Sequence, residues 1–270
     1  MTRGARRPPR RPKRARPPRP QGQIDLVRVA GSAAVAALFQ RSPDRVERLF
    51  FAADRRNEAA AFCQRLSRLR KPYRQVDADE LARVAGTAMH GGIVALARPR
   101  PVLPFDPAAA ASWSTAAPLL MVLDGISNPH NLGAIVRTAA FFGLDRLVIS
   151  DHPLQAGPSD AAHRVAEGGL EFVQLYRASG LATALKRLKP AYRIVGTALG
   201  RGRPLASLHA DAPVAVVLGN EEAGLDNAVI AACDELVTLP GSGWVQSLNV
   251  SATAAILIHE LHAARRCDRR

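Results

Sequence analysis

The chain has 270 residues, of which 47% are apolar, so it is long enough for one large or two medium-sized domains with a well-formed core. Its formal net charge of +14 at pH 7 argues against a cationic partner and favours an anionic one, with nucleic acid first. No apolar run approaches the length of a membrane helix, and the N-terminus lacks the apolar core of a signal peptide. We therefore expect neither a membrane protein nor a secreted one.

Cysteine and histidine usage argues against a metal site. Cys63, Cys233 and Cys267 lie far apart, their number is odd, and no CxxC spacing occurs. Of the seven histidines only His259 and His262 lie close together, in a stretch that suits a solvated helix face. We expect no zinc site, no disulfide framework and a reducing, cytoplasmic location.

The positive charge is concentrated at the N-terminus. Nine Lys and Arg residues and no acidic residue lie within residues 1–20, so the rest of the chain has a net charge of only +5. Residues 1–22 are also rich in proline and low in complexity, which predicts a disordered tail. Such a tail serves as a polyelectrolyte arm that adds sequence-independent RNA affinity, or it is solvated with no specific role.

Residues 24–97 are predicted to form a small α/β domain, because turn residues separate short apolar runs from helical patterns. The expected helices cover 31–39, 55–70 and 78–85, and the expected strands cover 45–52, 73–76 and 92–97. No catalytic constellation is evident here. His90, beside Gly91 and Gly92, suits a turn better than a catalytic role.

A proline-rich stretch at residues 98–117 predicts an interdomain linker, and strands and helices alternate from 118 to 266. The expected strands cover 119–123, 146–149, 171–175, 193–197, 214–218 and 235–239, and the expected helices cover 129–143, 159–167, 179–188, 226–233 and 247–266. This alternation predicts a parallel sheet covered on both faces. Ligands bind outside the carboxyl ends of such strands, which points to the loops after Leu123, Leu218 and Leu239.

In the first of these loops, Asn128 and Pro129 mark a turn and the entry of a helix. Asn131 falls in the first turn of that helix, and Arg137 lies off its apolar stripe. Taken alone, Asn131 is typical of a polar side chain in the first turn of a helix, and Arg137 is typical of a solvated charge on a helix surface.

The second loop follows the nearly continuous apolar strand at 214–218. Gly219 would let a ligand approach the backbone closely, and Glu221 and Glu222 stand at a helix entrance, where carboxylates are common. The loop contains neither GxGxxG nor a Walker sequence, so a dinucleotide site of the usual kind is not supported.

The third loop contains the turn residues 240–243 and leads into a helix expected from about Ser247. Ser247, Asn249 and other small polar residues gather at the start of that helix, which predicts a site for a polar or anionic group. An ordinary strand, turn and helix with capping Ser and Asn explains the pattern equally well.

Taken together and in this order, the three loops resemble the motifs of the SpoU (TrmH-like) family within the SPOUT superfamily of RNA methyltransferases. The resembling segments read NPHNLGAIVRTAAFFG, LGNEEAGL and LPGSGWVQSLNVSATAA. Residues 24–97 resemble, more loosely, the accessory RNA-binding domain related to ribosomal protein L30e that some members of the family carry.

The resemblance implies that residues 118–266 form an α/β methyltransferase domain with a mostly parallel sheet, and that the C-terminal segment of this domain passes through a loop to form a trefoil knot. It implies a homodimer that methylates a ribose 2′-hydroxyl of tRNA or rRNA with S-adenosylmethionine. The residues implied to bind this cofactor are Leu218, Gly219, Asn220, Leu239, Pro240, Gly243 and Leu248.

The resemblance also implies catalytic roles. Arg137 matches the essential arginine of the first motif, Asn131 its asparagine, and Glu221 the glutamate of the second motif. Ser247 and Asn249 match the pair that positions the reacting centre. A guanidinium has a pKa above about 12, so we expect Arg137 to clamp the target phosphate and not to act as a general base.

Two segments depart from the family pattern, and one segment has two interpretations. Gly241 and Ser242 stand where many members have a Met after the Pro, and His90-Gly91-Gly92 stands where relatives have His-Gln-Gly. Residues 163–169 could line the RNA side or form a helix with its glycine cap. The alternatives to ribose methylation are methylation of a base nitrogen and a non-catalytic RNA-binding or ribosome-assembly factor.

Overall fold

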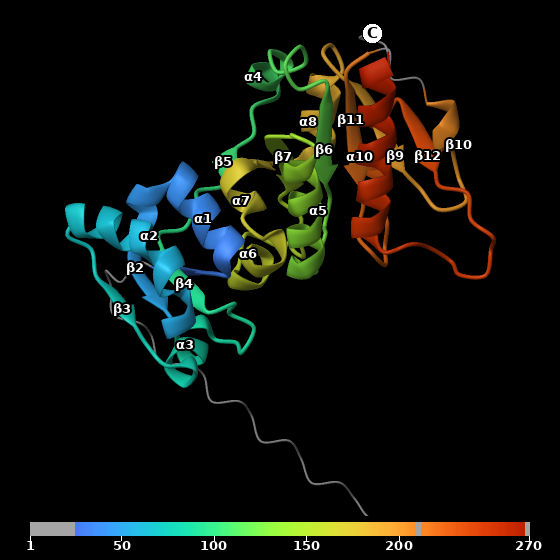
Figure 1. Ribbon diagram of the computed structural model, residues 1–270. Coiled ribbons are helices and arrows are strands. Elements are labelled where there is room, and N and C mark those ends of the chain that lie inside the picture. Colours follow the sequence, from blue (N-terminus) through green and yellow to red (C-terminus); the bar gives the residue numbers. More distant parts are fainter. Residues whose placement is uncertain (1–24, 209–211, 268–270) are drawn as a thin grey trace, which may run out of the picture.

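The computed structural model describes residues 25–208 and 212–267, which form a four-stranded sheet and an eight-stranded sheet with their helices (Figure 1). The tail predicted at 1–22 lies outside these ranges. The α/β class and the large parallel sheet are confirmed. Within the described ranges, no helix is long and apolar enough to cross a membrane.

The small sheet has the strand order β1-β4-β2-β3. Its strands are β1 (Val27–Ala30), β2 (Val46–Phe51), β3 (Tyr73–Gln75) and β4 (Ile93–Ala97), and its main helices are α1 (Ser32–Arg41), α2 (Arg56–Arg68) and α3 (Ala78–Ala85). The predicted elements all occur, and β1 is an addition. This strand has only four residues, VRVA, which is too short a run to stand out from its surroundings as a strand.

The large sheet has the order β10-β12-β9-β11-β6-β7-β8-β5, and its strand pairs are parallel. The strands are β5 (Leu103–Pro104), β6 (Leu119–Leu123), β7 (Arg146–Ser150), β8 (Gln174–Ala178), β9 (Arg193–Thr197), β10 (Arg203–Pro204), β11 (Val214–Leu218) and β12 (Glu235–Thr238). Every residue of β6 and β11 is buried, as expected of strands in the middle of a covered sheet.

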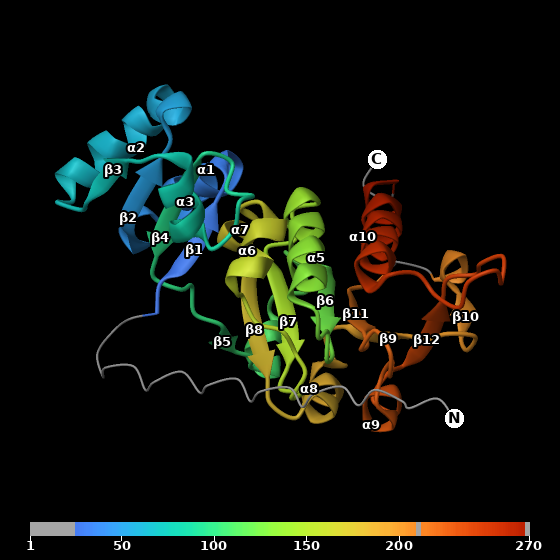
Figure 2. The ribbon, with the colours of Figure 1, turned by 90° about the horizontal axis from the view of Figure 1, so that it is seen from below.

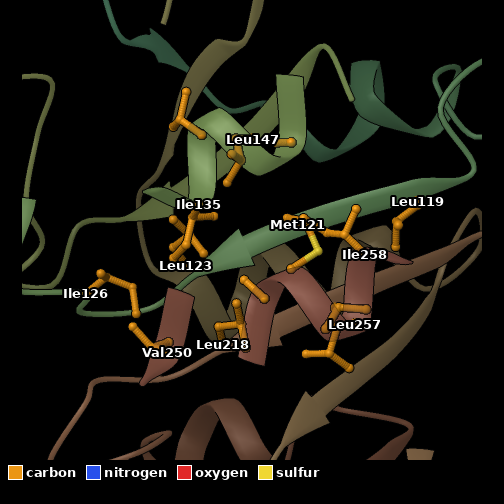
Figure 3. Close-up of a cluster of buried hydrophobic side chains, with 14 of the residues drawn as sticks. Leu119, Met121, Leu123, Ile126, Ile135, Leu147, Leu218, Val250, Leu257 and Ile258 are labelled. Carbon is orange, nitrogen blue, oxygen red and sulfur yellow. The ribbon is translucent and has the colours of Figure 1, made fainter. Parts of the chain in front are cut away.

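Helices cover both faces of this sheet. They are α4 (Pro107–Ala111), α5 (Pro129–Phe141), α6 (Asp160–Ala166), α7 (Gly169–Phe172), α8 (Leu181–Leu188), α9 (Asn227–Ile230) and α10 (Val250–Cys267). On one face, Ile135 of α5 and Leu257 of α10 meet Met121 and Leu218 of the central strands (Figure 3). On the other face, Leu185 of α8 belongs to a second buried cluster.

Two elements differ from the predictions. Residues 171–175 were expected as a strand, but Gly169–Phe172 form α7 and the strand β8 starts at Gln174. The last helix begins at Val250 and not at Ser247. Asn249 caps it, because its Oδ1 accepts hydrogen bonds from the backbone N–H and the hydroxyl of Ser251 at 2.8 and 2.6 Å.

The stretch 98–117 packs against the large sheet. Its short strand β5 pairs with β8, and its helix α4 lies against α8. The ring of Trp113 contacts Phe105 and Tyr176 and lies beneath the guanidinium of Arg146. These contacts fix the path of the chain between the two sheets.

The small sheet is docked on the large one through α1 and β1, which contact α6 and α7 (Figures 1 and 2). Two ion pairs cross this contact: Arg28 with Asp160, and Arg45 with Glu171, both at 2.6 Å. The side chain of Glu171 is only 1% exposed. Burial raises the pKa of this carboxyl, and the charges of Arg45 and the nearby Arg100 oppose the rise.

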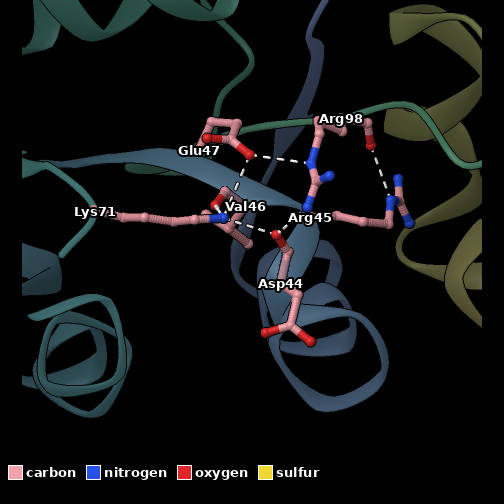
Figure 4. A network of polar contacts seen from close by, with 6 residues as sticks. All are labelled: Asp44, Arg45, Val46, Glu47, Lys71 and Arg98. Carbon is pink, nitrogen blue, oxygen red and sulfur yellow. Dashed lines mark hydrogen bonds and ion pairs between the residues drawn. The ribbon is translucent and has the colours of Figure 1, made fainter. Parts of the chain in front are cut away.

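A polar network on the small sheet surrounds Arg45 (Figure 4). Arg45 Nε donates to the backbone carbonyl of Arg98 at 2.8 Å. Arg98 in turn pairs with Glu47 at 3.1 Å, and Lys71 donates to the carbonyls of Asp44 and Val46. This network holds Arg45 in place, so that its Nη1 reaches Glu171 across the contact.

Candidate active site

The carboxyl ends of β6, β11 and β12 meet at one edge of the large sheet, and three candidate residues join there in a chain of hydrogen bonds. Asn131 Nδ2, in the first turn of α5, donates to Glu221 Oε1 at 2.8 Å. Asn249 Nδ2, at the start of α10, donates to Asn131 Oδ1 at 3.1 Å. One residue from each of the three loops therefore takes part in one contact chain.

Glu221 is the centre of this site. Its carboxylate accepts the backbone N–H of Ser127 at 3.1 Å and that of Asn128 at 3.4 Å, and the amide of Asn220 also lies 3.4 Å away. Burial alone would raise the pKa of Glu221, but hydrogen bonds, that of Asn131 first, outweigh burial and hold the pKa below its ordinary value of 4.5. Glu221 is thus ionised at neutral pH and holds the first and second loops together.

Glu221 lies within a tight turn. The backbone groups of Asn220 and Gly224 exchange two hydrogen bonds of 3.0 Å, and Asn220 Nδ2 donates to the carbonyl of Gly125 at 2.7 Å. A Cβ on Gly219 would lie 2.4 Å from the carbonyl carbon of Gly224. Gly219 is therefore required by the close approach of two backbone segments.

The third loop is open to solvent. Residues 240–249 are exposed, including the large apolar side chains of Trp244, Val245 and Leu248, which are 93%, 71% and 51% exposed. Ser247 lies on this loop, two residues before Asn249. Within the described part of the chain, no hydrogen bond connects Ser247 to the chain of Asn131, Glu221 and Asn249.

Arg137 lies apart from this chain. It is six residues beyond Asn131 on α5, a spacing of about 9 Å along the helix axis and about 120° around it. Its Nη2 pairs with Glu167 Oε2 at 2.9 Å, at the end of α6. One copy of the chain thus brings together Asn131, Glu221 and Asn249, and directs Arg137 toward the α6–α7 segment.

Sequence reasoning missed the contacts that organise the site. Ser127 and Asn128 act through their backbone N–H groups, which residue type does not reveal. Asn220, which is predicted to bind the cofactor, also fixes the turn with its side chain, a contact that residue type does not reveal. Glu167 belongs to the 163–169 segment. Neither that segment nor the first motif predicts its ion pair with Arg137.

Comparison with known proteins identifies the family. Residues 118–259 match the model of the SpoU rRNA Methylase family, and residues 28–103 match the model for RNA 2'-O ribose methyltransferase substrate binding. The 23S rRNA (guanosine-2'-O-)-methyltransferase RlmB of Acinetobacter baylyi is 33% identical over 237 residues, 85% of this chain and 94% of that protein. The RlmB of Nitrosomonas europaea is 32% identical over 86% of this chain and 89% of that protein.

Solved structures share the fold. The SpoU methyltransferase AviRb from Streptomyces viridochromogenes, in complex with AdoMet, superposes with a TM-score of 0.67 at 21% identity and covers 90% of this chain and 91% of that chain. The AdoMet-bound rRNA methyltransferase from Sinorhizobium meliloti has a TM-score of 0.70 at 18% identity and covers 88% of this chain and 87% of that one.

The residues present here suit S-adenosylmethionine. Leu218 is buried at the end of β11, and Leu239 and Leu248 are partly exposed on the third loop, which gives apolar surface for an adenine ring. Asn249 ties the end of that loop to Glu221 through Asn131, so the second and third loops are held next to each other. The chain belongs to the SpoU family and is an RNA ribose 2′-O-methyltransferase that uses S-adenosylmethionine.

Proposed function

We propose that the substrate is large-subunit ribosomal RNA and that the methyl group goes to a guanosine 2′-hydroxyl. The observation that carries this proposal is the alignment with the RlmB proteins, which spans at least 85% of the chain and is therefore long enough to extend over parts of both matched regions. A ribosomal substrate also accounts for the basic chain, and we expect such an enzyme in the cytoplasm.

The catalytic task is alignment. Bound S-adenosylmethionine supplies an activated methyl group, so the protein has to hold the hydroxyl in line with it. Asn131, Glu221 and Asn249 keep the three loops in register, and Ser247 and Asn249 position the ribose. Arg137 clamps the phosphate next to the target nucleotide, since a guanidinium can form two parallel hydrogen bonds with phosphate oxygens.

We infer that the enzyme acts as a homodimer with a shared site. In one chain Arg137 points away from the polar chain of Asn131, Glu221 and Asn249, so a second copy would complete the constellation. The side chains of Phe141 on α5 and Ile256 on α10 are 82% and 37% exposed, and their helices pack side by side. Such an apolar surface suits a partner subunit.

Three further expectations remain part of this proposal. The catalytic domain covers 118–266, the substrate-binding domain covers 24–97, and 98–117 connect them. The C-terminal segment forms a trefoil knot, and the cofactor lies in it against Leu218, Gly219, Asn220 and the third loop. Of that loop, Leu239, Pro240, Gly243 and Leu248 contribute mainly backbone groups and apolar surface.

A methyl-transfer assay tests the proposal. Labelled S-adenosylmethionine is incubated with ribosomal RNA or tRNA from cells that lack this protein, with wild type beside Arg137→Ala. We expect label in large-subunit rRNA, in alkali-resistant dinucleotides, and none with the variant. Label in tRNA alone would refute the proposed substrate, and full activity of Arg137→Ala would refute the role of that residue. A monomer in light scattering at assay concentration would refute the dimer.

A further inference from the structure

The segment that joins α6 to α7 faces Arg137. Glu167 Oε2 lies 2.9 Å from Arg137 Nη2, and the two side chains are 52% and 57% exposed. The contact uses one nitrogen of a guanidinium that carries five N–H donors. Donors therefore remain for a second anionic group, such as an RNA phosphate.

Glu167 has a backbone conformation that an L side chain rarely adopts. Its φ and ψ are 44° and 45°, in the left-handed region, where a helix C-cap usually has Gly or Asn. Among the described residues, only Arg70 and Glu167 combine a positive φ with a side chain. A carboxylate at a position that favours glycine points to a role for the side chain.

Two glycines next to Glu167 let the backbone pack closely against α5 and α1. A Cβ on Gly169 would lie 3.2 Å from the carbonyl oxygen of Val136 and 3.3 Å from Arg137 Cα, so this backbone lies directly on α5 at Arg137. A Cβ on Gly168 would lie 2.7 Å from Ala37 Cβ on α1. The backbone of the segment is thus held between α5 and the domain that carries α1.

A close helix contact fixes the preceding turn as well. A Cβ on Gly133 of α5 would lie 2.6 Å from the carbonyl oxygen of Ala162 and 2.9 Å from Val165 Cβ on α6. The end of α6 therefore packs directly against the backbone of α5, which only a glycine at this position allows. As a result, backbone packing determines where the Glu167 carboxylate meets the guanidinium.

We propose that Glu167 is a positioning residue for methyl transfer, which orients the Arg137 guanidinium so that its remaining N–H donors face the phosphate of the bound RNA. The proposal rests on the phosphate-clamp role given to Arg137 under the proposed function. Because Gly168 contacts α1, docking of the substrate-binding part helps to set the position of this pair. Glu167 acts through Arg137 and does not touch the reacting atoms.

Kinetics of charge-removing variants test this role. Glu167→Gln keeps the shape of the side chain and removes its charge, and Glu167→Asp keeps the charge. Asp145→Asn is the matched control, because Asp145 is 57% exposed and pairs with Arg146 at 3.4 Å. We expect Glu167→Gln to lower kcat about three- to fivefold with KM for S-adenosylmethionine unchanged, a size typical of one exposed ion pair. Glu167→Asp should recover part of this loss, and Asp145→Asn should match wild type.

Arg137→Lys provides the decisive background. If Glu167 acts through the guanidinium, adding Glu167→Gln to Arg137→Lys should lower kcat less than twofold further. An equal loss in both backgrounds, or a Glu167→Gln enzyme with the kcat of Asp145→Asn, would overturn the proposal. If Glu167→Gln has the kcat of Asp145→Asn, the Arg137→Ala enzyme separates the two proposals. An inactive Arg137→Ala enzyme would leave the role of Arg137 intact, whereas an active Arg137→Ala enzyme would refute the proposed function itself.

Discussion

Two arginine–glutamate pairs flank the α6–α7 segment, and they differ in burial more than in distance. The side chains of Arg45 and Glu171 meet at 2.6 Å and are 15% and 1% exposed. Those of Arg137 and Glu167 meet at 2.9 Å and are both more than half exposed. A buried charge that loses its partner stays uncompensated, whereas an exposed charge is solvated by water. We infer that the first pair maintains the docking of the two sheets and that the second is available to RNA.

Removing the arginine of the buried pair should have the largest effect on stability. In Arg45→Ala, Glu171 would remain buried without its closest positive partner, so we expect a loss of about 3–5 kcal/mol in the free energy of unfolding. Urea denaturation measures it. Arg48→Ala, at an exposed position of the neighbouring strand β2, is the control and should cost less than about 0.5 kcal/mol. Equal losses in the two variants would show that the buried pair has no special role.

Adding a methyl group where the backbone packs tightly near the two ion pairs should have the next largest effect on stability. Gly168→Ala combines a φ of 92° with a Cβ 2.7 Å from Ala37 Cβ, and Gly143→Ala has a φ of 77° with no atom within 4 Å. We expect Gly143→Ala to cost about 1 kcal/mol through backbone strain, and Gly168→Ala about 1–2 kcal/mol more through overlap with α1. Thermal unfolding of the two variants measures the difference. Equal costs would mean that α1 moves away freely at this contact.

The pH dependence of stability shows whether the charges of Arg45 and Arg100 fully offset the cost of burying the Glu171 carboxylate. Burial raises the folded-state pKa of Glu171 above 4.5, its ordinary value in the unfolded chain. At any pH between these two pKa values, folding therefore takes up a proton. The contribution of Glu171 is therefore fully present below pH 4.5 and is lost as the pH rises through its folded-state pKa, by at most about 1.4 kcal/mol per pH unit.

Glu171→Gln removes this titration. Wild type should therefore lose stability relative to Glu171→Gln as the pH rises from 4.5 to 7, as measured by urea denaturation at both values. A wild type that gains stability relative to the variant over this range would show that Arg45 and Arg100 more than compensate burial.

Local patterns predicted the parts of the fold that depend on periodicity. The buried strands β6 and β11 occur at their predicted residues, and the parallel sheet brings three loops to one edge, because parallel strands share a carboxyl end. The family motifs in turn directed attention to Asn131, Glu221 and Asn249, which the structure joins by hydrogen bonds.

The pairs could not have been predicted in the same way. Arg45 and Glu171 are 126 residues apart, in the short turn before β2 and in α7, so neither helical nor strand periodicity relates them. Residues 171–175 were predicted as a strand because they are mostly apolar, but α7 places Glu171 in the contact. For Arg137, the sequence indicated its position off the apolar stripe, but its partner depends on how α6 ends.

The exposed pair should show opposite effects on stability and activity, which a purely structural contact would not. Glu167→Gly replaces a side chain at φ 44° with the residue that adopts this conformation most readily, so we expect a gain of about 0.5–1 kcal/mol in the free energy of unfolding. An exposed ion pair contributes too little to offset this gain. The same variant should have a lower kcat for methyl transfer, because the Arg137 guanidinium loses its orienting carboxylate. Thermal unfolding and steady-state kinetics on one preparation measure both effects. A variant that is less stable and equally active would mean that Glu167 serves the fold, and the distinction between the two pairs would then disappear.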